Sequence, residues 1–160
     1  MTQLKNLTLT QVKKETNEKY KPKKQVVFDN KTKVDVETVF RPSRKNKLKA
    51  ELLHILTEAL TANQPFDAGL ILGIETMLAI KYFTSLKTDA ATFGQYMEML
   101  HLLNDGGYTE PILDAFDADE LHKLFEELDA ALGVFNQAID RELEKWNSEY
   151  ADTEKHTETA

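Results

Sequence analysis

The sequence predicts a mainly α-helical fold: a compact bundle of four to five helices, with a small N-terminal β-hairpin and flexible termini. Apolar residues recur every three or four positions over residues 48–59 and 121–146, which is the spacing of amphipathic helices. Between these stretches, residues 70–86 are apolar on nearly every face, as is typical of a buried central helix. Over residues 34–40, β-branched and aromatic residues alternate with polar ones, which indicates a strand.

The chain length favours a single domain, because two separate cores in 160 residues would each be small. We expect three parts: a flexible basic arm at 1–25, one helical domain at 26–148, and a flexible tail at 149–160. The two ends are polar and offer little apolar surface to offset the entropy cost of ordering them.

The hairpin is expected over residues 26–40, with its turn at Asp29 and Asn30. Side chains of these two types hydrogen-bond the local backbone and tolerate left-handed conformations. Two strands alone are marginally stable in water, so the hairpin must pack on the helices or pair with another chain.

Capping residues and helix breakers predict where the helices begin and end. The expected starts are Ser43, Asp67, Thr88–Asp89, Thr109–Pro111 and Asp117. Ser, Thr and Asp side chains accept hydrogen bonds from unpaired N–H groups of the first turn, and proline is tolerated there. Gly106 and Gly107 end the helix before them. The last helix runs from Asp117 towards Trp146, about 30 residues and about 45 Å.

Several classes of protein are excluded by what the chain lacks. It has no cysteine, so it has no disulfide framework, thiol nucleophile or cysteine-ligated metal. The N-terminus has no apolar run of signal-peptide length, and residues 70–86 are interrupted by Glu75 and Lys81. We therefore expect a cytoplasmic protein that does not interact with membranes.

Charge is distributed very unevenly along the chain. The first 50 residues hold 14 Lys/Arg and 5 Asp/Glu, a net +9, whereas the remaining 110 hold 6 and 22, a net −16. The basic part can bind nucleic acid, bind the acidic part of a neighbouring copy, or remain a solvated tail. The acidic part repels a duplex, so nucleic acid is the less favoured partner.

No arrangement of residues points to catalysis, a metal or a cofactor. His122 and Glu126 lie four residues apart, but no third ligand follows at metal spacing. Acidic residues around Asp117 lack the glycine of a calcium loop and are better explained as helix caps. We therefore expect a non-enzymatic binding protein that needs no cofactor.

Two sets of residues are candidates for protein binding. The basic set opens the first helix of the predicted domain: Arg41, Arg44, Lys45, Lys47 and Lys49. The apolar set lies along the last helix: Phe125, Leu132, Phe135, Ile139 and Trp146. In a homo-oligomer, the basic set of one copy is expected to dock on the acidic last helix of the next, head to tail. The alternative is a small regulatory protein that binds nucleic acid through residues 41–49.

In its organisation, the chain resembles tail assembly chaperones of long-tailed bacteriophages that infect Gram-positive hosts. The resemblance covers roughly residues 26–147: the β element, the basic Arg-Pro-Ser-Arg-Lys turn, the apolar segment LILGIETMLAIKYFTSL and the closing acidic helix. It implies a small, self-associating, non-enzymatic protein of the host cytoplasm. Such a protein coats the tape-measure protein during tail assembly until tail-tube protein replaces it.

Overall fold

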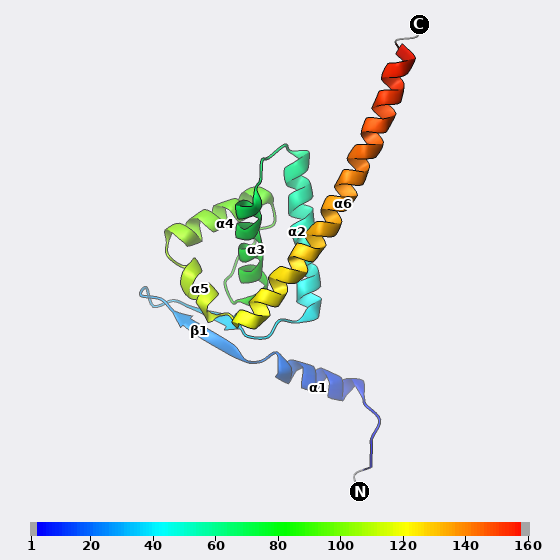
Figure 1. Ribbon diagram of the computed structural model, residues 1–160. Helices are drawn as coiled ribbons and strands as arrows, with labels where there is room; N and C mark the ends of the chain where they lie inside the picture. The colour runs from blue at the N-terminus through cyan, green and yellow to red at the C-terminus, as the bar shows by residue number, and fades with distance from the viewer. Residues whose placement is uncertain (1–2, 158–160) are drawn as a thin grey trace. The chain divides into compact units, whose positions relative to one another are not determined.

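The computed structural model describes residues 3–157, with side chains described as far as residue 149 (Figure 1). This part of the chain forms six helices and one two-stranded antiparallel hairpin, which confirms the mainly helical prediction. It divides into two compact units, and the boundary between them falls after Phe125, inside the last helix.

The N-terminal arm, which was predicted to be flexible, contains a helix, α1 (Leu9–Lys19). Its start is capped by Thr8, whose side chain accepts a hydrogen bond from the Gln11 amide at 3.2 Å. None of the residues of α1 is buried. The sequence did not predict this helix, and the flexibility of the arm stays a prediction.

The predicted hairpin is present, as β1 (Lys23–Val27) and β2 (Lys33–Glu37) with Val26 opposite Val34. Its turn uses Asn30, whose side-chain oxygen accepts from the Thr32 amide at 3.2 Å. β1 begins before residue 26, the boundary expected for the helical domain.

The hairpin is anchored by the chain that leaves α3 (Ala68–Phe83). Val36 pairs with Thr84 in an isolated β-bridge, and the Ser85 amide donates to the Asp35 carbonyl at 2.9 Å. The Asp35 amide in turn donates to the Ser85 hydroxyl at 2.8 Å. These contacts, together with burial of the β2 valines, explain how so small a sheet is stable here.

Helix α2 (Pro42–Thr61) begins one residue before the predicted cap, with Arg41 as N-cap and no side-chain capping bond. Ser43 was therefore wrongly predicted as the cap: Pro42 occupies the first helical position, where its missing N–H costs nothing. Asp67 caps α3 as predicted, accepting from the Leu70 amide at 2.8 Å. Residues 74–80 of α3 are all buried, as expected of a central helix.

Helix α4 (Phe93–Asp105) begins four residues later than predicted, at a capping box formed by Thr92 and Gln95. The predicted start at Thr88–Asp89 was wrong because the Thr88 hydroxyl instead accepts from the Ala90 amide at 3.2 Å, in a local turn. The helix ends at Gly106, as predicted, and Gly107 takes a left-handed φ of 75°.

Two helices complete the chain: the short α5 (Thr109–Ala115), as predicted, and α6 (Ala118–Thr157). Asp117 caps α6 by accepting from the Glu120 amide at 3.0 Å. With 40 residues α6 is about 60 Å long and extends well beyond Trp146, into the predicted tail. No helix in residues 3–157 is long and apolar enough to cross a membrane.

Aromatic rings join the hairpin to the helices of the first unit. Phe40, just after β2, stacks on Phe83 of α3 with ring centroids 4.0 Å apart and meets Phe116 edge-on at 5.6 Å. Gly73 of α3 allows a close approach to α4, since a Cβ there would lie 2.8 Å from Leu100.

Candidate protein-binding site

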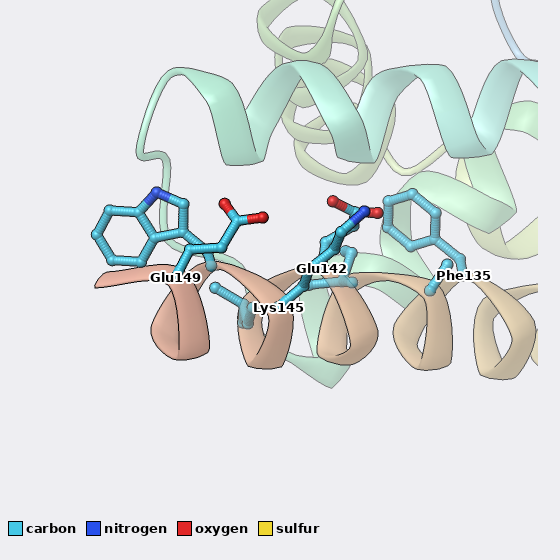
Figure 2. Close-up of a pocket in the computed structure, with 8 residues that line it drawn as sticks. Phe135, Glu142, Lys145 and Glu149 are labelled. Atoms are coloured by element: carbon cyan, nitrogen blue, oxygen red, sulfur yellow. The ribbon is translucent and has the colours of Figure 1, made fainter. Parts of the chain in front are cut away.

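A groove of about 580 Å³ lies along the second half of α6, and every residue that lines it comes from this helix (Figure 2). Its walls are Phe135, Ala138, Ile139, Glu142, Leu143, Lys145, Trp146 and Glu149. Large apolar side chains therefore form its surface, with charged groups between them.

The groove continues the apolar stripe that begins at the start of α6. A turn of 100° per residue places Phe135, Ile139 and Trp146 within an arc of about 40°. Leu124 and Leu128 lie on the same stripe and are fully buried, whereas Trp146 is 61% exposed. The stripe thus changes from a buried face to an exposed one along a single helix.

The electrostatic character of the groove is acidic. Glu142 and Glu149 lie about 20° and 40° to one side of the arc of Phe135, Ile139 and Trp146, and Lys145 lies about 80° away on the same side. Residues 126–149 contain seven Asp/Glu and two Lys/Arg, a net charge of −5. A helix with an apolar face and cationic flanks would complement this surface.

The structure brings together three members of the predicted apolar set. Phe135, Ile139 and Trp146 line the groove, while Phe125 and Leu132, both partly exposed, are not among its lining residues. The prediction that these residues bind a protein remains untested, but most of the set forms one continuous surface.

Two arginines of the predicted basic set, Arg41 and Arg44, have partners within the first unit. The Arg44 guanidinium donates to the Glu37 carboxylate at 2.7 Å and to the Tyr82 carbonyl at 3.2 Å. The Arg41 guanidinium lies 4.9 Å from the centre of the Tyr20 ring. Lys45 and Lys49 also have interaction partners, and Lys47 is exposed. These contacts give no support for a continuous cationic surface that binds phosphates.

A polar network that the sequence analysis missed joins α2, α3 and α4. Lys81 donates to the Glu51 carboxylate at 2.9 Å, to the Ala90 carbonyl at 2.7 Å and to the Tyr96 hydroxyl at 3.0 Å. The hydroxyls of Tyr82 and Tyr96 both donate to Glu51. All three ammonium protons of Lys81 and both oxygens of Glu51 therefore have partners.

The network also shifts the titration of its members. Burial acts to raise the pKa of Glu51, but hydrogen bonds from Lys81 and the two tyrosines, with the Lys81 charge, hold the pKa below its usual value. Burial, together with hydrogen bonding to Glu51, raises the pKa of Tyr82 and of Tyr96 well above that of a free tyrosine. This saturated arrangement fastens three helices together and leaves no group aimed at a ligand.

The residue in the sequence that could have indicated this network is Lys81. It interrupts an otherwise apolar helix, and a lysine in such surroundings requires an acceptor. Its partners lie 30 and 15 residues away, on other helices, so local spacing did not identify them. In the part of the chain that the structure describes, no group of three or more potential metal ligands is found.

Comparison with known proteins identifies one family. The model of the YomO family matches residues 9–159, which is nearly the whole chain. No curated protein and no solved structure gives a significant match. The match extends from the first residue of α1 into the C-terminal part of α6. The chain therefore belongs to the YomO family, whose name is phage-associated.

Proposed function

We propose that this protein is a non-enzymatic tail assembly chaperone that holds apolar helical segments of the tape-measure protein until tail-tube protein replaces it. The observation that carries the proposal is the exposed apolar groove on α6. A groove of this kind fits the recognition mode in which an amphipathic helix lays its apolar face against a complementary surface.

The residues of the groove suit such a role. Trp146 is of a residue type that often dominates binding energy at protein interfaces, and Phe135 is of a type enriched in interface cores. Glu142 is placed to interact with a cationic residue beside the apolar face of the bound helix. Such rim charges favour the right orientation and partner more than they add affinity.

Two further observations support a role in phage assembly. The family has a phage-associated name, and the organisation of residues 26–147 resembles tail assembly chaperones. The engagement of Arg41 and Arg44 within the first unit disfavours the alternative of nucleic-acid binding through residues 41–49.

Co-expression with the tape-measure protein of the same phage tests the proposal. We expect the tape-measure protein to become soluble and to co-purify with this chain. The variant Trp146→Asp is expected to reduce co-purification about tenfold or more, because it replaces a large aromatic side chain of the groove with a charge.

Val134→Asp is the matched control, since Val134 is an exposed apolar residue of α6, 69% exposed, that does not line the groove. A tape-measure protein that stays insoluble, or equal losses for the two variants, would refute the proposal. Salt-sensitive binding of this chain to duplex DNA would instead favour the nucleic-acid alternative.

A further inference from the structure

We infer that α1 of one copy docks in the α6 groove of a second copy, so that the chain associates head to tail through its own N-terminal arm. The inference depends on one part of the proposed function, the ability of the groove to bind a helix. It names a segment of this same protein as the occupant when no partner is bound.

Helix α1 exposes two apolar side chains on one face. Leu9 is 84% exposed and Val12 is 36% exposed, and Thr16 lies on the same face of the helix. Lys13 and Lys19 flank this face on its two sides. It therefore has the pattern that the groove requires: an apolar face bordered by cations.

The lengths of the two surfaces agree. Helix α1 has 11 residues and is about 16 Å long. The aromatic part of the groove, from Phe135 to Trp146, rises about 16 Å along α6. One arm helix therefore covers the aromatic part of one groove.

The arm that holds α1 and the second half of α6 carry opposite charges. Helix α1 itself has three lysines and two glutamates, a net +1; the whole arm, residues 3–24, has a net +5, and residues 126–149 carry −5. Pairing them neutralises both segments, which would otherwise repel their own kind when copies approach. Complementary charge of this sort chiefly sets orientation and association rate.

Pairing of two α6 helices through the same face is less favourable. It would place the glutamates of the groove, Glu142 and Glu149, in a shared apolar interface, with much of their hydration lost. A contact between two different surfaces also leaves each copy with one unused arm and one unused groove. It therefore propagates to a ring or an open chain of copies.

Trp146 provides a direct readout, because it is the single tryptophan of the chain and lies in the groove. With the full-length protein, we expect its emission to shift to shorter wavelength as concentration rises, in parallel with the mass measured by light scattering. Both changes should decline as NaCl is raised from 50 to 500 mM, because the flanking charges become screened.

Charge reversals with matched controls locate the contact. Lys13→Glu and Glu142→Lys are each expected to weaken association about tenfold, since an attraction becomes a repulsion. Lys14→Glu and Glu144→Lys change the net charge equally but lie on other faces of the same helices, and should change it less than about twofold. Combining Lys13→Glu with Glu142→Lys in one chain should restore association.

Three outcomes would overturn the inference: a monomer at all concentrations in 50 mM NaCl, a concentration-independent emission of Trp146, or equal effects of the reversals and their controls. Suppose that one of these outcomes is found, but the tape-measure protein still co-purifies with the unchanged chain and not with Trp146→Asp. In that case only the self-docking inference fails. If Trp146→Asp leaves that capture intact while the charge cycle behaves as expected, only the proposed function fails.

Discussion

Removing the carboxylate of Glu51 is expected to destabilise the first unit strongly. In Glu51→Ala, the hydroxyls of Tyr82 and Tyr96 lose their acceptor and Lys81 loses its counter-ion. The side chains of Glu51 and Lys81 are only 14% and 22% exposed, so water replaces these interactions poorly.

The size of the effect follows from the bonds lost. A hydrogen bond to a charged group contributes about 1.5–3 kcal/mol, and three such bonds end on this carboxylate. The contributions of coupled partners are not additive, and Lys81 keeps the Ala90 carbonyl and the Tyr96 hydroxyl. We therefore expect the free energy of unfolding to fall by about 3 kcal/mol, or Tm by about 6–12 °C.

Urea denaturation followed by circular dichroism measures this change. The control is Lys33→Ala, which breaks the Lys33–Asp35 ion pair, at 3.2 Å and between side chains that are 57% and 29% exposed. An exposed pair of this kind contributes less than about 1 kcal/mol. If Glu51→Ala costs no more than Lys33→Ala, the reasoning that ties stability to the buried network is wrong.

Three other perturbations have expected outcomes. Because the folded state raises the pKa of Tyr82 and Tyr96, the unfolded chain loses these protons first as the pH rises. The free energy of unfolding should therefore fall above about pH 10, and it should fall less in the Tyr82→Phe variant. Thermal melts between pH 8 and 11 measure this change. Gly107→Ala should cost about 1 kcal/mol in denaturation experiments because φ is 75° there, whereas Gly133→Ala, within α6 and with no atom near its Cβ position, should stabilise the helix or leave it unchanged. Asp67→Ala should lower the free energy of unfolding by about 1 kcal/mol through loss of the α3 cap, and Asp67→Asn, which keeps an acceptor oxygen, should recover most of it.

Features governed by neighbouring residues were predicted well. Asp67 and Asp117 cap helices as expected, Asn30 forms the hairpin turn, and Gly106 ends α4. These predictions succeed because the donor and acceptor lie within a few residues of each other, so the sequence alone places them together.

The missed elements have different causes. Thr8 and Gln11 match the spacing of a capping box, a local signal of α1 that the lack of apolar periodicity obscured. The start of α4 was placed too early because the Thr88 hydroxyl accepts from the Ala90 amide in a local turn, while the capping box that starts the helix is formed by Thr92 and Gln95. Two capping signals lie close together in this segment, and local spacing did not decide between them.

The sequence by itself determined the helical class, the hairpin and the apolar stripe of α6, because periodicity and capping depend on residues close together in the chain. Only the tertiary structure decided which charges are used inside the fold. It joined Lys81 to Glu51, and Arg44 to Glu37, and so reduced the basic surface that charge counting had suggested. It also decided that the stripe is buried at Leu124 and exposed at Trp146, because exposure depends on what packs against a residue and not on its place in the helical repeat.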